Sequence, residues 1–195
     1  MSSDIDPKSG FRLPLPNRED LDEAGKAAFD RSAKPGASLA GLQGPGGVQL
    51  YSPKTAQWSN SLNRYLRFDA GFSPRIRELA ILATAREMDS QFEWVAHEEE
   101  ALKEGVPQST VDIIKHRRPT TGADETDAVV IELVRQIWRD HKVTSEMFAK
   151  AKTIFGPTKL VELVMLSGNY AATAALLCTV DMQLHAGKKP LLPIP

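Results

Sequence analysis

The stretch SPRIRELAILATAREMDSQFEWVAHEEEALKEG, residues 73–105, decides the fold of this protein. Ser73 is followed by a proline, and this pair is typical of a helix start because serine caps the first turn and proline suits the first helical position. The pattern predicts two consecutive helices, over 73–89 and 90–104, and Gly105 is a normal stop for the second. The predicted unit is a helical hairpin.

The rest of the chain is also predicted to be helical. Prolines, glycines and capping residues separate segments whose apolar residues recur at helical spacing. These predicted helices cover 17–34, 53–68, 107–115, 124–141, 144–155 and 157–186. Since no segment shows the sustained alternation of a strand, the predicted fold class is all-α.

One internal similarity stands out. Residues 75–82 (RIRELAIL) resemble residues 159–166 (KLVELVML), and each follows closely on a proline. The similarity predicts a duplicated helical hairpin, although the period is too long for a solenoid.

Composition narrows the class of protein. The chain has 195 residues, of which 42% are hydrophobic and 25% charged, and these values predict one packed globular domain. A net charge of −1 disfavours a nucleic-acid partner, which usually meets a basic face. The apolar stretch 170–180 is too short to span a membrane, so no membrane partner is expected. A single cysteine and the absence of a signal-like start predict a cytoplasmic location.

The chain divides by composition into three parts. Residues 1–16 are rich in proline and are predicted to form an arm that packs on the body or on a neighbouring subunit. Residues 17–187 form the predicted helical domain, and 188–195 form a short tail. Within the domain, the glycine-rich segment 34–53 is long enough to be a lid or a binding loop.

Two polar side chains lie on apolar helix faces in the hairpin. Glu78 shares a face with Ile81 and Leu82, where a carboxylate is either a favourable helix-start acid or a paired, functional group. His97 lies four residues after Glu93, so the two side chains meet on one face, and a carboxylate there orients and charges an imidazole. An exposed Glu–His pair without a catalytic role, or a core histidine whose ring nitrogens are hydrogen-bonded, would show the same spacing.

These residues resemble a known family. Residues 77–82 (RELAIL), 92–97 (FEWVAH) and 105–107 (GVP) are similar to the carboxymuconolactone decarboxylase family, which includes the AhpD alkylhydroperoxidase branch. Residues 162–170 resemble the second half of its larger members, and the resemblance covers roughly 20–187. It implies an AhpD-like helical bundle that assembles into trimers or hexamers.

The resemblance also implies which branch applies. The peroxidase branch carries a Glu, a Cys-x-x-Cys pair and a His, and Glu78 and His97 match the first and last of these. Ser90 and Glu93 stand at the cysteine positions, and dithiol exchange needs both thiols. We expect Cys178 to be a buried structural thiol. The remaining set, Glu78, Glu93 and His97, resembles the thiol-free decarboxylase branch and is the predicted catalytic group.

The second predicted hairpin keeps a carboxylate, Glu162, but Asp181 stands where His97 would be and Leu177 stands where Glu93 would be. The chemistry is therefore expected in the first hairpin.

Three further residues are candidates for substrate binding: Ser90, Trp94 and Arg75. Arg75 belongs to a group of arginines around the first helix that could meet a substrate carboxylate, together with Arg64, Arg67, Arg77 and Arg86. A metal ion with mixed oxygen and nitrogen ligands could also be bound by Glu78, Glu93 and His97. The HExxH metal-binding pattern is absent, however, and no cofactor is predicted.

The sequence thus predicts a cofactor-free lyase that acts on a small carboxylic acid or lactone from aromatic breakdown by acid–base chemistry. The predicted steps are loss of CO2 and protonation of the intermediate by His97, with Glu93 orienting His97 and Glu78 relaying a proton or stabilising an oxyanion. An isomerase or hydratase, an AhpD-like peroxidase and a non-catalytic oligomeric binding protein are the alternatives. A homo-oligomer is expected.

Overall fold

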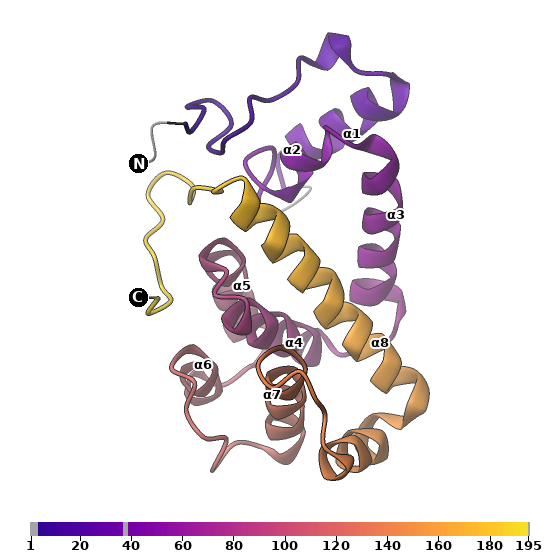
Figure 1. The fold of residues 1–195 in the computed structure, drawn as a ribbon, viewed down its shortest axis with the longest axis vertical. Coiled ribbons are helices and arrows are strands. Elements are labelled where there is room, and N and C mark those ends of the chain that lie inside the picture. Colours follow the sequence, from indigo (N-terminus) through magenta and orange to yellow (C-terminus); the bar gives the residue numbers. More distant parts are fainter. Residues whose placement is uncertain (1–3, 37–38, 195) are drawn as a thin grey trace.

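The computed structural model describes residues 4–36 and 39–194, and all the regular elements within these ranges are helices, with no β-strand (Figure 1). The predicted all-α class is confirmed. The helices are α1 (Glu23–Ala33), α2 (Pro45–Gln49), α3 (Pro53–Arg64), α4 (Pro74–Glu87), α5 (Gln91–Lys103), α6 (Gln108–Lys115), α7 (Glu125–Trp138) and α8 (Ser145–Thr179), with a 3-10 turn η1 (Arg18–Asp20) and a π-helical turn η2 (Tyr65–Asp69).

Helix α4 is the centre of the core. Every residue from Arg77 to Arg86 is buried, and the helix packs against α5, α6, α7 and α8. Ala80 and Ala83 are small enough to let neighbouring helices approach closely, while Leu79 and Leu82 fill the space between them. A helix enclosed on all sides places its polar side chains inside the protein, where they need partners.

The hairpin of α4 and α5 forms as the sequence predicts. The Ser73 hydroxyl accepts a hydrogen bond from the backbone N–H of Ile76 at 3.2 Å, which caps α4. Asp89 adopts a left-handed conformation (φ 47°) in the turn between the helices, and Gly105 does the same (φ 89°) after α5. This tight turn packs α5 against α4 and aligns their facing side chains.

The expected second hairpin takes a different form. Helix α8 kinks at Gly156 (φ 71°) and then runs without interruption to Thr179, so it ends before residue 186 and never folds back. The position that matches Asp89 is Thr173, a β-branched residue that disfavours a left-handed turn, and the helix therefore continues. The similar segments 75–82 and 159–166 therefore each lie near the start of a helix, but only the first is part of a hairpin.

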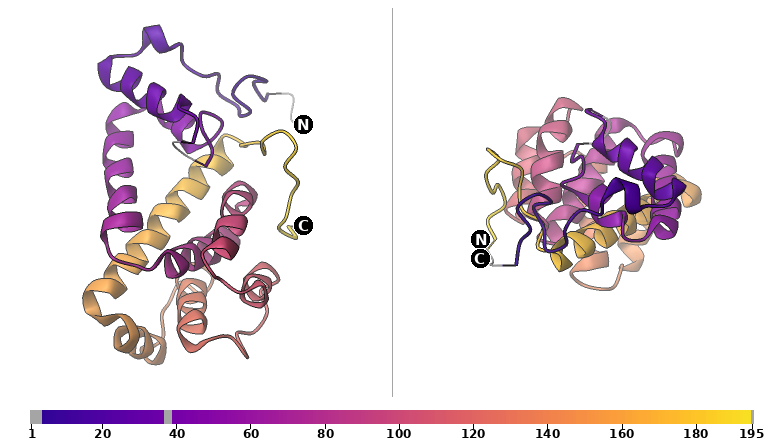
Figure 2. Two further views of the ribbon diagram at one scale, coloured as in Figure 1. Left: turned by 180° about the vertical axis from the view of Figure 1, so that it is seen from behind. Right: turned by 90° about the horizontal axis from the view of Figure 1, so that it is seen from above.

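By length and composition, α8 could also cross a membrane, because its most apolar window has a mean hydropathy of 1.5. The sequence prediction considered only 170–180 and missed this length. About 44% of the window is buried inside the protein, and a core helix has the same composition. In Figures 1 and 2, α8 lies between α3 and the α4–α5 hairpin, and it contacts α3, α4 and α7.

The N-terminal part departs from the predicted helix at 17–34. Asn17 precedes only the short turn η1, and α1 begins after Asp22, whose side chain accepts from the N–H of Gly25 at 2.7 Å. The preceding arm packs on its own chain, because Phe11 is fully buried against Val48 and Val180. Figure 2 shows this arm beside the C-terminal segment. The boundaries at 16 and 187 stay predictions.

Candidate functional site

A carboxylate and an imidazole meet between α4 and α5. Glu78 Oε2 lies 2.7 Å from His97 Nδ1, and both side chains are almost completely buried. Glu78 occupies the second turn of α4, and His97 lies in the middle of α5, so the antiparallel hairpin brings them to a similar height. An ionised carboxylate only accepts hydrogen bonds, so Nδ1 carries the proton and Nε2 is the nitrogen left for chemistry.

A second carboxylate flanks the other side of the ring. Glu93 Oε2 lies 3.6 Å from His97 Nε2, one helical turn earlier on α5. This separation is too long for a good direct hydrogen bond, so the imidazole is bonded firmly to Glu78 and only loosely to Glu93. The three predicted catalytic side chains therefore converge, but their pairing is asymmetric.

The two carboxylates have opposite pKa shifts. Burial raises the pKa of Glu78, but the hydrogen bonds from His97 and Arg77 and the nearby Arg67 cation outweigh it, so the net pKa is lowered. Burial also raises the pKa of Glu93, and the attraction of His97 and Arg67 does not compensate. Glu78 is the ionised partner, and Glu93 is the acid that retains its proton to higher pH.

Two arginines support Glu78 from the side opposite His97. Arg77 Nε donates to Glu78 Oε1 at 3.0 Å, and an Arg67 guanidinium nitrogen lies 3.6 Å from the same oxygen. Arg77 also donates to the carbonyl of Arg67 at 3.0 Å, which ties α4 to the π-helical turn η2. The buried charge of Glu78 is thus compensated, as a carboxylate in a core requires.

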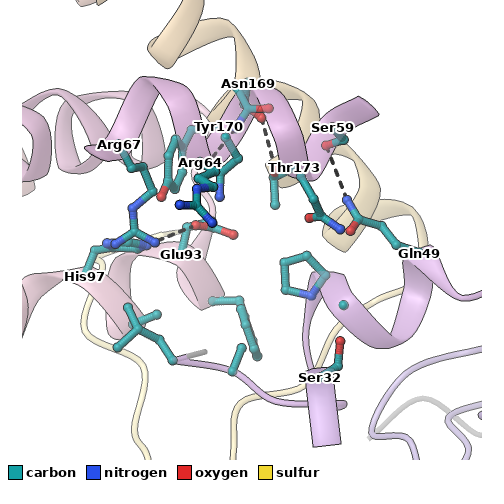
Figure 3. A pocket seen from close by; sticks show the side chains of 18 of the residues that line it. Ser32, Gln49, Ser59, Arg64, Arg67, Glu93, His97, Asn169, Tyr170 and Thr173 are labelled. Carbon is teal, nitrogen blue, oxygen red and sulfur yellow. Dashed lines mark hydrogen bonds and ion pairs between the residues drawn. The ribbon is translucent and has the colours of Figure 1, made fainter. Parts of the chain in front are cut away.

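The imidazole faces a cavity of about 340 Å³ that Figure 3 shows from close by. His97 and Glu93 form one wall, and Asn169, Tyr170 and Thr173 of α8 form another. The remaining lining comes from the end of α1, the segment 39–49, and α3 with η2; its polar members include Ser32, Gln49, Ser59, Asn60, Asn63, Arg64 and Arg67. Glu78 lies behind His97 and does not line the cavity.

Tyr170 is the nearest polar neighbour of the imidazole on α8. Its ring packs edge-on against the His97 ring, with centroids 5.3 Å apart at an angle of 85°. Burial raises the pKa of its phenol, so the hydroxyl keeps its proton and acts as a hydrogen-bond donor. In Figure 3 it lies beside Arg67 on the cavity wall.

The cavity also carries positive charge. Arg64 lines it from an exposed position, and it forms no ion pair with any residue in the described part of the chain. Arg67 is partly buried, and its Nε atom has no hydrogen-bond partner among the described residues. Two arginines with donors to spare suit a ligand that carries a carboxylate.

The structure assigns other roles to the three predicted substrate-binding residues, none of which lines the cavity. Arg75 donates to the buried Asp127 at 2.6 Å and anchors α7 to α4. Trp94 is fully buried and donates to Glu98 at 3.0 Å. Ser90 is the residue that precedes α5, and it is buried at the hairpin turn. Helix spacing placed Trp94 near His97, but it did not show that Trp94 turns towards the core.

The sequence missed the residues that come from outside the hairpin. Tyr170 lies on the buried stripe of α8, where an aromatic residue is normally taken as core. The prediction of a binding loop at 34–53 agrees with the cavity lining of residues 39–49, although residues 37 and 38 lie outside the described residues. Arg64 and Arg67 belonged to the group of arginines noted in the sequence, whereas Arg75, the member predicted to bind substrate, does not line the cavity.

Cys178 is exposed rather than buried. The buried stripe of α8 passes through Ala174 and Leu177, and the next residue points away from it. Cys178 does not line the cavity, and Ser90 and Glu93 carry no thiol.

No group of three or more His, Cys, Asp or Glu side chains within 4–36 and 39–194 has an arrangement that could hold a metal ion. His97 instead has both ring nitrogens directed at carboxylates. The arrangement is that of an acid–base group.

The fold and site define an AhpD-like, all-α protein with a thiol-free carboxylate–histidine centre. The sequence pattern of the carboxymuconolactone decarboxylase family matches residues 53–134, which run from the start of α3 into α7. This segment belongs to that family, as the sequence predicted, and it contains Glu78, Glu93 and His97.

A solved structure is similar over much of the chain. It is a protein of unknown function from Agrobacterium tumefaciens, proposed to be the antioxidant defence protein AhpD. The TM-score is 0.64 at 14% identity, and the match covers 71% of this chain and 95% of that one. At this identity the likeness shows the fold alone. No curated protein matches the chain.

Proposed function

We propose that this protein is a cofactor-free lyase of carboxymuconolactone decarboxylase type that acts on a small carboxylic acid or lactone from aromatic breakdown. The observation that carries the proposal is the Glu78–His97 pair, whose free nitrogen, Nε2, faces a cavity that also contains two arginines. Acid–base catalysis needs an oriented imidazole next to a space for substrate, and both are present.

In the proposed reaction, Arg64 and Arg67 bind the substrate anion. The bond between the substrate and its carboxyl carbon breaks, CO2 leaves, and the electron pair moves into the conjugated carbonyl to give an enolate. The Tyr170 hydroxyl and the protonated Glu93 donate hydrogen bonds to the developing oxyanion. Protonated His97 then delivers its Nε2 proton to carbon, and the imidazole regains a proton from solvent.

The geometry exchanges the roles that the sequence predicted for the two glutamates. Glu78, rather than Glu93, orients the imidazole, because it holds Nδ1 at 2.7 Å and has the lowered pKa. Glu93 takes the role of the acid, because burial raises the pKa of its carboxyl. A fixed anion behind the imidazole and an uncharged acid in front of it favour proton delivery into the cavity.

The test is a panel of lactone carboxylates and β-keto acids, with CO2 release measured on the wild-type protein and on His97→Gln. We expect release from at least one class of compound, reduced by about 10²–10⁴-fold in the variant. Deuterium incorporation from D2O without CO2 release would indicate the isomerase or hydratase alternative instead. Tight binding with no turnover would indicate a binding protein.

The peroxidase alternative has little support. The one cysteine lies outside the cavity, and the positions of the dithiol are Ser90 and Glu93. The structural likeness to a protein described as antioxidant rests on fold only.

A further inference from the structure

A second cavity adjoins the first. It has a volume of about 170 Å³, and four residues line both cavities: Leu39, Ala40, Phe92 and Ala96. Ala96 and Phe92 on α5 line both cavities, whereas His97 on the same helix lines only the first. A ligand that occupies the first cavity therefore has room for a substituent in the second.

The walls of the second cavity are apolar. Val95 and Leu184 line it, together with the four shared residues. Two of its charged residues, Glu99 and Lys188, lie at the rim, since their side chains are 84% and 55% exposed and approach each other at 3.9 Å. The third, Glu100, is 31% exposed and pairs at 3.6 Å with Lys103, which does not line the cavity. The interior thus favours an uncharged group.

The size of the cavity indicates which apolar group it fits. A cavity of about 150 Å³ with apolar walls holds one benzene molecule. Phe92 and His185 form an aromatic corner here, with ring centroids 5.6 Å apart and planes tilted by 40°. Tilted aromatic neighbours favour a further ring in an offset or edge-on position.

One buried polar atom accompanies these walls. His185 Nε2 is buried and has no hydrogen-bond partner among the residues that the structure describes. A buried polar atom without a partner is unfavourable, so a ligand that supplies the partner is favoured. A hydroxyl group fits either tautomer of the ring because it both donates and accepts.

We infer that the second cavity binds a hydroxyl-bearing aryl group of the ligand, with the ring against Phe92 and the hydroxyl on His185 Nε2. The inference deepens the proposed function, on which it rests for the position of the acidic group near Arg67. It describes the far end of the substrate: a carboxylic acid joined by a short chain to a hydroxyphenyl ring.

Calorimetric titration tests the inference through matched acids. The probes are acetate, propanoate and butanoate, the same acids with a terminal phenyl group, and the same acids with a terminal 4-hydroxyphenyl group. In wild-type protein we expect the best phenyl acid to bind roughly ten- to a hundredfold more tightly than its parent acid. The hydroxyl should tighten binding by several-fold more.

Two variants separate these gains. Val95 lines only the second cavity, so Val95→Phe should fill it and abolish the phenyl gain while the parent acid binds as before. His185→Phe keeps an aromatic wall and should abolish only the hydroxyl gain. Ile154→Phe, at an exposed position of α8 before its kink at Gly156, is the matched control and should change neither gain. If Val95→Phe does not fold, as judged by its thermal melt, Val95→Leu should reduce the phenyl gain in its place.

Absence of a phenyl gain in the wild-type protein, or a gain that survives in folded Val95→Phe, would overturn the inference. A hydroxyl gain that survives in His185→Phe would overturn the assignment of His185. The His97→Gln variant should keep both gains, because the measurement is of binding. The binding measurements can therefore be interpreted even if the protein has no lyase activity.

Discussion

Glu78 and His97 are joined at 2.7 Å through Nδ1, and the carboxylate lies behind the imidazole, outside the cavity that His97 faces. This makes Glu78 a positioning residue: it acts on the substrate only through the ring. Its charge selects the tautomer with Nε2 available and fixes the orientation of the ring.

Glu78→Gln is expected to lower kcat by about a hundredfold or more while KM changes little, because the amide no longer fixes the tautomer of the ring. The matched control is Glu162→Gln, at the repeated position on α8, where the carboxylate accepts from the Tyr65 hydroxyl outside the cavity. That variant should retain full activity. Equal losses in both variants would contradict the assignment.

Glu93→Gln should stabilise the protein at neutral pH. The folded-state pKa of Glu93 is raised, so between the ordinary carboxyl pKa and the raised one the folded state binds a proton that the unfolded state has lost. Stability therefore falls as pH rises through this window, and an amide avoids the loss. Thermal melts of the wild-type protein and of Glu93→Gln test this. The two Tm values should agree at pH 4, and at pH 8 the Tm of the variant should be higher. Each kcal/mol added to the free energy of unfolding raises Tm by about 2–4 °C. A Tm of Glu93→Gln below that of the wild-type protein at pH 8 would contradict the raised pKa of Glu93.

Arg67→Gln should raise KM for an anionic substrate, whereas Arg75→Gln should leave KM unchanged and lower stability. Arg67 lines the cavity, and Arg75 pairs with Asp127, whose carboxylate is fully buried. Removal of a partner from a buried charge costs about 3–5 kcal/mol, and somewhat less here because Arg75 is 30% exposed. Steady-state kinetics and denaturant unfolding on both variants make the comparison. A KM effect at Arg75 would restore it as a binding residue.

Cys178→Ser should have no effect on activity or on Tm beyond about 1 °C, because the thiol is exposed and does not line the cavity. The wild-type thiol should react quickly with a thiol-modifying reagent without unfolding. Hydroperoxide consumption with a dithiol reductant should be absent. Consumption that Cys178→Ser abolishes would revive the peroxidase alternative.

The outward face of α8 is expected to be a subunit contact. Val161 and Met165 are 62% and 46% exposed there, and Trp58 on α3 is 74% exposed. Val161 and Met165 lie one helical turn apart, and neighbouring exposed apolar side chains favour association. Light scattering should show an oligomer, and Val161→Asp combined with Met165→Asp should shift it towards the monomer. Lys103→Asp, on the polar end of α5, should leave the oligomer intact.

Local chemistry in the sequence was enough to define the hairpin and half of the site. Ser73 before a proline starts α4, and Gly105 ends α5, through interactions within one or two turns. The meeting of Glu93 and His97 follows from helical spacing alone. The sequence also determined that no dithiol exists, since one cysteine is present.

Only the tertiary structure decided which glutamate holds the imidazole and which has the raised pKa. Both carboxylates are buried, but Arg77 and Arg67 lie beside Glu78. It also decided that Tyr170, far along the chain on α8, completes the cavity and that Arg75 and Trp94 do not. Charge states depend on the burial and the distances of groups from separate helices, and packing sets those quantities rather than helical periodicity.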